Sequence, residues 1–430
     1  MKIIAKLRKK LADFLKSADK KVLIIVAILF CLFSFFRFYA LETKNVFGPD
    51  QVDNAWAAKE IIDDKKFPLA GMEARGSSGF FIGPLYYYYI TPFYLLTDLD
   101  PVASGIIAGV SAIITFVVFA LIVSKIFSLN VALIGLFFLT FSFHIINFDR
   151  LQGPVSLIPL FSLIIYYSLY KILTGYPKYI FLLAVALGSM FNLHFTAFLF
   201  LPIVALSVFF FPRKKDTLIY LTFSIPIFLL FVAPIFIHSY ISSGIPRQNF
   251  TNFLNDSVHG LSTQGFLQLK HEIFMEFESL LFFPVLEFAA PLIFILFLLL
   301  MLYKTNRKKL VIFFLSVVWI LSPWIVFSSY TNPIIDYYLR MTMPVIIISI
   351  SFVLYRLIKL KNPFIILLIG LVALYYAFFN VKQFFEQEYE GGLKVFRERT
   401  MEKISNGENI RYRRGLPDSY LYYINVERKK

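Results

Sequence analysis

The stretch LVIFFLSVVWILSPWIVF, residues 310–327, contains no ionisable side chain, and it follows the basic sequence Arg307-Lys308-Lys309. About 20 helical residues are needed to cross the roughly 30 Å of hydrocarbon in a bilayer. A stretch of this length and composition therefore predicts a membrane-spanning helix. A membrane β-barrel would instead show short segments in which apolar and polar residues alternate, and this stretch does not alternate.

Comparable apolar stretches recur along most of the chain. Of its 430 residues, 58% are hydrophobic and 16% are charged, and the mean hydropathy is +0.72. A soluble domain carries about 25% charged residues. We therefore predict an all-α polytopic membrane protein, in which a bundle of about eleven transmembrane helices occupies residues 22–381. The predicted spans are residues 22–40, 101–124, 130–147, 155–172, 179–194, 196–211, 217–239, 287–303, 310–329, 337–357 and 363–381.

The positions of Lys and Arg predict how these spans are oriented. If the spans alternate in direction, the short segments on the side of the amino terminus hold half of the 42 Lys and Arg residues. Short basic loops of membrane proteins face the cytoplasm. Residues 1–21, which have the pattern of a basic amphipathic helix on the membrane surface, are therefore expected in the cytoplasm. Loops 41–100 and 240–286 and a small tail domain, 382–430, are expected outside it.

The net charge of +15 is thus explained mainly by membrane topology. A nucleic-acid partner is not expected, because the basic residues are divided between short loops and a tail of mixed charge. The expected partners are membrane lipids, and the expected location is the plasma membrane, which the chain crosses many times.

Several ionisable side chains approach the membrane near the outer ends of the predicted spans, and none of them lies near the midpoint of a span. A charge within the bilayer is costly and signals either function or the end of a helix. A proton- or ion-coupled transporter would place carboxylates or broken helices near the bilayer midplane. The pattern therefore favours a site at the outer membrane surface. The residues concerned are Arg37, His144, Asp149, Arg150, His194, His238, Glu287, Asp336 and Arg340.

Four short motifs lie in or near the segments expected outside the membrane. Asp50-Gln51 follows Pro49 at the head of a helical pattern, and Gly83-Pro84-Leu85-Tyr86-Tyr87 opens a second pattern. Asp149-Arg150 is followed by Pro154, and Leu193-His194-Phe195-Thr196-Ala197 ends a predicted span. The four motifs together fall between residues 45 and 215.

These motifs resemble those of the GT-C superfamily of glycosyltransferases that use polyprenyl-phosphate sugars. The resemblance is to bacterial proteins similar to protein O-mannosyltransferases and to the aminoarabinose and Rgt-type lipopolysaccharide transferases. It covers residues 45–215 well and the remainder only in hydropathy. Where many relatives read Asp-Gln-Gly-Arg-Asp, this chain reads Asp50-Gln-Val-Asp53-Asn54, which loses an arginine and shifts an acidic residue.

The resemblance implies an enzyme of cell-envelope glycan or lipopolysaccharide synthesis that moves a hexosyl or pentosyl group, with inversion, from a polyprenyl phosphate to an extracytoplasmic lipid, saccharide or protein. Such a reaction needs a base for the acceptor hydroxyl and cations for the departing phosphate. Asp50 is the expected base. Arg150, Arg247 and Arg340 are the expected phosphate ligands, because the guanidinium fork fits phosphate oxygens in pairs. The expected pocket residues are Gln51, Asp53, Tyr86, Tyr87, His194 and His238.

No cofactor is implied, although Asp50 and Asp53 could together hold a divalent metal. Each of the other assignments also has a structural alternative. Asp50 could simply cap a helix whose first turn is acidic. Tyr86 and its neighbours could form an interfacial aromatic belt. Arg340 could extend its side chain toward the membrane surface.

Further alternatives concern Arg150 and the tail. Arg150 could pair with Asp149 or Asp336 at a neighbouring helix end, and residues 420–424 could form a short strand. Two other functions also share the hydropathy pattern. One is a non-catalytic transporter or assembly factor for lipid-linked saccharides, which would not need Asp50. The other is a polymerase of saccharide repeat units.

Overall fold

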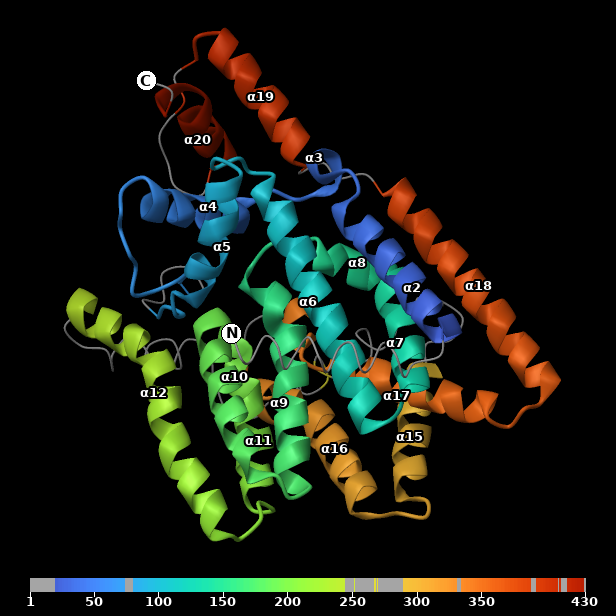
Figure 1. The fold of residues 1–430 in the computed structure, drawn as a ribbon. Helices are drawn as coiled ribbons and strands as arrows, with labels where there is room; N and C mark the ends of the chain where they lie inside the picture. The colour runs from blue at the N-terminus through green and yellow to red at the C-terminus, as the bar shows by residue number, and fades with distance from the viewer. Residues whose placement is uncertain are drawn as a thin grey trace.

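The computed structural model describes most of the chain as α-helices joined by short connections (Figure 1). Within the described part, β-structure is limited to two isolated bridges, Val46 with Gly392 and Glu73 with Phe81. Residues 1–19 and nearly all of the 240–286 loop beyond residue 243 lie outside the description. The described residues are 20–73, 80–243, 251, 267, 269, 289–330, 334–387, 392–408, 410 and 416–428.

Within this part, six helices are long and apolar enough to cross a bilayer. A pair of shorter helices, α7 (Leu129–Phe141) and α8 (Phe143–Asp149), makes a seventh span if the two are counted together. The six are α2 (Lys20–Phe38), α6 (Ala103–Ile126), α9 (Ile158–Leu173) with the 3-10 turn before it, α12 (Lys215–Ser243), α16 (Arg307–Phe327) and α18 (Pro363–Glu386).

The other four predicted spans coincide with shorter apolar helices. By length alone, six or seven of the eleven predicted segments therefore qualify as membrane spans. The shorter helices are α10 (Ile180–Leu193), α11 (Phe200–Val208), α15 (Ala289–Leu302) and α17 (Met343–Ile358).

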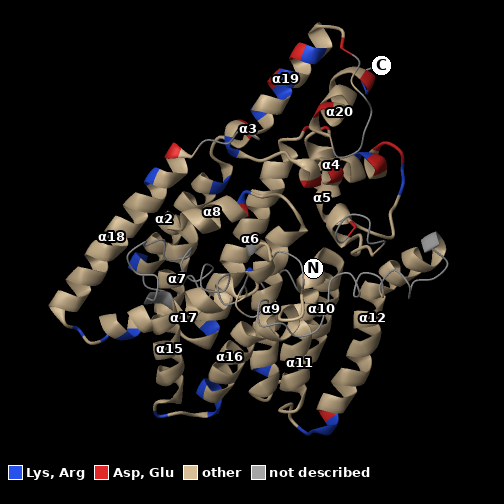
Figure 2. Cartoon of the chain, turned by 180° about the vertical axis from the view of Figure 1, so that it is seen from behind, with Lys and Arg blue, Asp and Glu red and all other residues tan. Residues whose placement is uncertain are grey.

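The bundle has two chemically different ends (Figure 2). One end, which we call the loop end, carries α3 (Leu41–Lys44), α4 (Pro49–Ile62), α5 (Leu85–Leu96) and the tail helices (Figure 1). At the opposite end, the helix connections and the first turns that follow them contain a single acidic residue, Asp216, in the first turn of α12. This distribution is the one expected if the second end faces the cytoplasm. The basic residues of these connections and first turns are Lys178, Arg213, Lys214, Lys215, Lys304, Arg307, Lys308, Lys309, Lys359 and Lys361.

Helix α4 begins where its sequence favours a helix start. Pro49 occupies its first turn, where the missing N–H costs nothing. The Gln51 side chain accepts a hydrogen bond at 3.0 Å from the backbone N–H of Gly48, the residue before the helix. Small residues such as Ala55 and Ala58 are fully buried, which lets α4 lie close to its neighbours. The position of Asp50 is therefore defined by local sequence.

The tail is helical, so the alternative of a strand at residues 420–424 is wrong. It consists of α19 (Leu393–Ser405) and α20 (Pro417–Tyr422), followed by a π-helical turn, Tyr423–Glu427. Pro417 starts α20, and the side chains of Tyr420 and Leu421 are completely buried. Burial against α4 stabilises the helix, and the described part of the chain offers no strand with which this segment could pair.

Two predicted spans differ from the observed helices. The predicted span 130–147 is bent by 72° between α7 and α8, because Ser142 adopts an extended conformation and accepts a hydrogen bond from the backbone N–H of Ile145. The predicted span 337–357 starts later than expected, at Met343, with Pro344 in the first turn of α17. A short 3-10 turn, Asp336–Leu339, precedes it.

Candidate active site

A cavity of about 310 Å³ lies at the loop end of the bundle. Its wall combines the linker before α4, the helix α8 and the turn after it, the segment before α17, and the end of α18. Three lining residues carry a positive charge and none is acidic, so the cavity is suited to an anion. The lining residues are Lys44, Val46, His144, Asn147, Phe148, Arg150, Leu151, Tyr337, Arg340 and Gln387.

The bend between α7 and α8 brings one face of α8 to the cavity. His144, Asn147, Phe148 and Leu151 have the spacing i, i+3, i+4 and i+7, which places them on the same side of a helix. None of the four was among the predicted site residues, although His144 was noted near the outer end of its span. Their spacing is visible in the sequence, but only the bend after Phe141 turns this face toward the other segments of the cavity wall.

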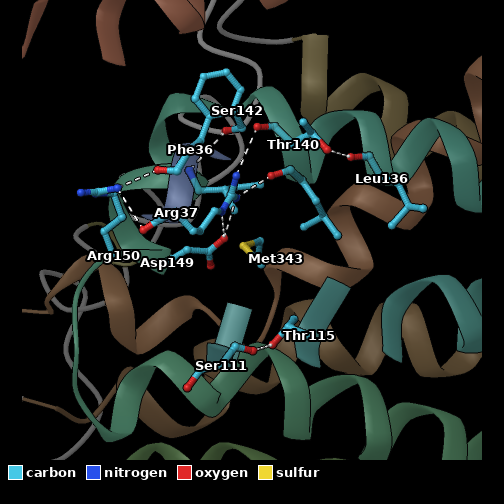
Figure 3. A network of polar contacts seen from close by, with 12 residues as sticks. Phe36, Arg37, Ser111, Thr115, Leu136, Thr140, Ser142, Asp149, Arg150 and Met343 are labelled. Carbon is cyan, nitrogen blue, oxygen red and sulfur yellow. Dashed lines mark hydrogen bonds and ion pairs between the residues drawn. The ribbon is translucent and has the colours of Figure 1, made fainter. Parts of the chain in front are cut away.

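A buried ion pair fixes the bend (Figure 3). Arg37 of α2 donates hydrogen bonds to one carboxylate oxygen of Asp149 from Nε at 3.0 Å and Nη2 at 2.6 Å. It also donates to the backbone carbonyls of Leu139 and Thr140 at the end of α7. A single guanidinium therefore joins α2, α7 and α8. Asp149 is thus paired with Arg37, and the predicted alternative of a pair with Arg150 is not what the structure has.

Arg150 caps the carboxyl end of α2. Its guanidinium donates hydrogen bonds to the carbonyls of Phe36 and Arg37 at 2.7 and 3.0 Å (Figure 3). It also donates to the carbonyls of Tyr39 at 2.8 Å and Lys44 at 3.4 Å. The last carbonyls of a helix have no partner within the helix and carry partial negative charge. Arg150 therefore neutralises a helix terminus while lining the cavity.

Lys44 caps the carboxyl end of α18 in the same way. Its ammonium donates to the carbonyls of Phe384, Phe385 and Gln387 at 2.9, 3.3 and 2.8 Å. Two helix carboxyl ends thus converge on the cavity, and each is capped by a cation. These backbone contacts occupy much of the hydrogen-bonding capacity of both residues.

Arg340 lies just before the first turn of α17, and its side chain is buried within the protein instead of extending toward a membrane surface. Its guanidinium lies 4.3 Å from the centre of the Phe148 ring, and Nη1 is 4.0 Å from the sulfur of Met343. It is also close enough to Asp149 for their charges to interact.

Asp50 occupies the first turn of α4, close in sequence to the cavity wall, and its side chain reaches solvent. Partial enclosure by protein, and secondarily the negative charge of Asp53, raises the pKa of Asp50 above its ordinary value. The amide of Gln51 donates to the carbonyl of Gln152 at 2.6 Å. This bond ties the start of α4 to the segment that follows Arg150 and Leu151 in the cavity wall.

The remaining predicted pocket residues fall into three groups. Tyr87 donates a hydrogen bond to Asp53 at 2.7 Å, and the hydroxyl of Tyr86 accepts one from Gln152 at 3.1 Å. Tyr86, Tyr87 and Asp53 therefore stabilise the first loop. His194 lies 5.8 Å, ring to ring, from the cavity residue Tyr337.

His238 of α12 instead packs against Phe81, with their rings 5.1 Å apart. Arg247 lies outside the described residues. Among the residues that are described, no cluster of three or more His, Cys, Asp or Glu side chains could hold a metal ion. Arg150 and Arg340 are therefore the predicted site residues that the structure brings together in the cavity, with the segment bearing Asp50 joined to its wall.

No family model and no curated protein matches this sequence. Solved structures do match it over almost its whole length. Membrane glycosyltransferases of the GT-C superfamily share its architecture, so the chain has the GT-C fold.

Two of these structures illustrate the match. One is ArnT from Cupriavidus metallidurans bound to undecaprenyl phosphate, with a TM-score of 0.59 at 12% identity, covering 94% of this chain and 75% of that one. The other is the archaeal oligosaccharyltransferase AglB from Archaeoglobus fulgidus in complex with an inhibitory peptide and a dolichol-phosphate. It aligns with a TM-score of 0.56 at 11% identity, covering 90% of this chain and 58% of that one.

Proposed function

We propose that this protein is a membrane glycosyltransferase that moves a sugar from a polyprenyl-phosphate donor to an acceptor at the loop end of the bundle, outside the cytoplasm. The observation that carries the proposal is the cavity at that end, whose wall holds Lys44, Arg150 and Arg340 and no carboxylate. In the same fold, solved structures contain undecaprenyl phosphate or dolichol-phosphate. An anionic lipid phosphate matches the charge of the cavity.

Arg340 is the best candidate for the phosphate ligand. Arg150 and Lys44 already donate to several backbone carbonyls, which supports a mainly structural role for both. At about 4 Å, a pair of unit charges in a partly buried site with an effective dielectric constant near 20 interacts by roughly 4 kcal/mol. A guanidinium beside the leaving phosphate would therefore lower the barrier to transfer appreciably.

Asp50 is the proposed general base. In a single displacement, the acceptor oxygen forms a bond to the anomeric carbon while the bond from that carbon to the phosphate oxygen breaks, which inverts the configuration. The acceptor's proton passes to Asp50, and the lipid phosphate leaves with the bonding electrons. The raised pKa of Asp50 suits a proton acceptor, because a more basic carboxylate accepts a proton more readily. No metal ion is needed for these roles.

The test compares donor classes. Purified protein in lipid nanodiscs is mixed with acceptor-containing membranes that lack it and with either polyprenyl-phosphate sugars or nucleotide sugars. We expect the release of polyprenyl phosphate in the first set only, also in the presence of a metal chelator. Turnover of nucleotide sugars alone would overturn the donor class. Binding of the donor without any turnover would favour a non-catalytic transporter or assembly factor, and products of increasing length would indicate a polymerase.

A further inference from the structure

The tail helix α20 lies against the segment that carries the proposed base. Tyr420, whose side chain is completely buried, meets the ring of Trp56 in the middle of α4 edge-on, with ring centres 5.4 Å apart. Its ring centre is also 6.1 Å from that of Phe47, which lies just before α4. Its hydroxyl donates a 2.9 Å hydrogen bond to the carbonyl of Leu99, beyond the end of α5. One side chain therefore contacts the loop at three separate points.

The end of α4 is held by the residues that follow Tyr420. Asp63, which directly follows the helix, accepts a 2.7 Å hydrogen bond from the hydroxyl of Tyr423. Its carboxylate also lies 3.3 Å from Nε of Arg428, while Nη1 of Arg428 is 2.7 Å from a carboxylate oxygen of Asp98. The tail is thus attached to the end of α4 and to the turn after α5 by charged groups.

The segment before α4 is held by the beginning of the tail. The backbone N–H of Leu393 donates to the carbonyl of Asn45 at 3.2 Å, and Val46 forms an isolated bridge with Gly392. Val46 itself lines the cavity. In α19, Arg397 forms ion pairs with both Glu42 and Asp100. The tail therefore contacts the loop before, along and after the helix that bears Asp50.

From this arrangement we infer that the tail is a clamp that sets the position of α4 relative to the cavity, with Tyr420 as its central positioning residue. The inference rests on the proposed function for its catalytic consequence, but its structural part stands separately. Most of the hydrogen-bonding and charged contacts lie outside the apolar bundle. Loosening them should release α4 without dissolving the bundle, because α4 can move while the spans remain packed.

The experiment measures α4 directly and transfer separately, using the full-length protein in nanodiscs. Hydrogen exchange followed by mass spectrometry reports the protection of the α4 amides. Tyr420→Ala is compared with Tyr422→Ala, a matched change on the same helix at a residue that makes none of the contacts above. We expect exchange in α4 to accelerate at least about tenfold in the first variant only, a change in opening free energy of roughly 1.4 kcal/mol.

Two further variants guard against simple misfolding of the tail. Tyr420→Phe keeps the ring and loses only the bond to Leu99, and Arg428→Gln loses the charged contacts with Asp63 at the end of α4 and with Asp98 after α5. Both should accelerate exchange in α4 by a smaller factor while α19 stays protected. Unchanged exchange in α4 in all three variants would overturn the clamp, whatever the activity.

Transfer assays then separate the two hypotheses. If the clamp positions Asp50, Tyr420→Ala should lower kcat about tenfold while KM for the polyprenyl-phosphate sugar stays within about twofold, because Tyr420 does not line the cavity. Accelerated exchange in α4 with a normal kcat would leave the clamp in place and count against Asp50 as the base. An increase in KM alone would contradict a positioning role.

Discussion

Arg37 and Asp149 form a buried ion pair between α2 and the end of the bent span, with Nη2 of the arginine 2.6 Å from the carboxylate. The same arginine bonds the carbonyls of Leu139 and Thr140, which end α7. Because α8 supplies much of the cavity wall, the pair determines the shape of the cavity without forming part of its lining.

We expect Arg37→Ala to destabilise the protein strongly. Removal of one partner leaves Asp149 buried without its counterion, and breaking a buried pair in this way typically costs about 3–5 kcal/mol. Thermal unfolding of the purified protein in one detergent measures the effect. The double variant Arg37→Met with Asp149→Leu should recover part of the loss, since it removes both charges of the pair together; the buried Arg340, whose charge also interacts with Asp149, limits the recovery. A normal melting temperature for Arg37→Ala would contradict the role assigned to the pair.

Arg340 and Arg150 should behave differently when each is replaced by alanine. Arg340→Ala should weaken the binding of polyprenyl phosphate at least about tenfold, or roughly 1.4 kcal/mol, with a small effect on thermal stability. Arg150→Ala should lower stability by at least about 1.5 kcal/mol, because carbonyls at the end of α2 lose a charged donor. Ligand-binding titrations and melting curves on the same samples separate the two effects.

Lys382→Ala serves as the control for both arginine variants. Lys382 is exposed on α18, where it pairs with Glu386 at 3.7 Å, and exposed pairs contribute little. Its replacement should change neither measurement. Equal losses of binding in the Arg150 and Arg340 variants, with no loss of stability in either, would show that the backbone contacts of Arg150 do not define its role.

The sequence predicted the apolar helices well because each long apolar run has few alternatives to a helix in a bilayer. It also placed the start of a helix next to Asp50, where Pro49 and Gln51 provide local signals. It could not predict the bend at Ser142. Besides the local bond to Ser142, partners distant in sequence support that bend: Arg37 pairs with Asp149, and the side-chain oxygen of Asn380 accepts a 2.7 Å hydrogen bond from the N–H of Phe143.

The same limit applies to the site. Arg150 and Arg340 were predicted as phosphate ligands from their positions near the ends of spans, and both line the cavity. The sequence could not predict that Arg150 donates to the end of α2 and to the residues just after it, because these carbonyls lie more than a hundred residues earlier in the chain. Tyr420 was missed for a similar reason, since its partners Trp56 and Leu99 are identified only by the tertiary fold.

The tail packs against α3 and α4, so the tail and the first loop lie on the same side of the bundle. The side of the membrane on which they lie can be tested by cysteine labelling. Two exposed residues are suitable for labelling: Ser405 in α19, and Thr305 in the connection before α16 at the opposite end of the bundle. Each is replaced by cysteine in a Cys31→Ser background. An impermeant maleimide should label the first in intact cells and the second only after permeabilisation. Ser77→Cys in the first loop should label with Ser405→Cys, and the opposite pattern would invert the proposed orientation.

Asp50→Asn should abolish transfer while leaving expression and thermal stability nearly unchanged at neutral pH. The amide cannot accept the acceptor's proton, and it removes a carboxylate that resists ionisation, since the pKa of Asp50 is raised. In the wild-type enzyme, activity should fall as the pH drops through that raised pKa, above the value of about 3.9 for a free aspartate. Asp53→Asn removes one cause of the increase and should move this acid limb to lower pH while retaining much of the turnover. Rates measured from pH 4 to 8 with a competent donor test both effects, and wild-type turnover by Asp50→Asn would exclude Asp50 as the base.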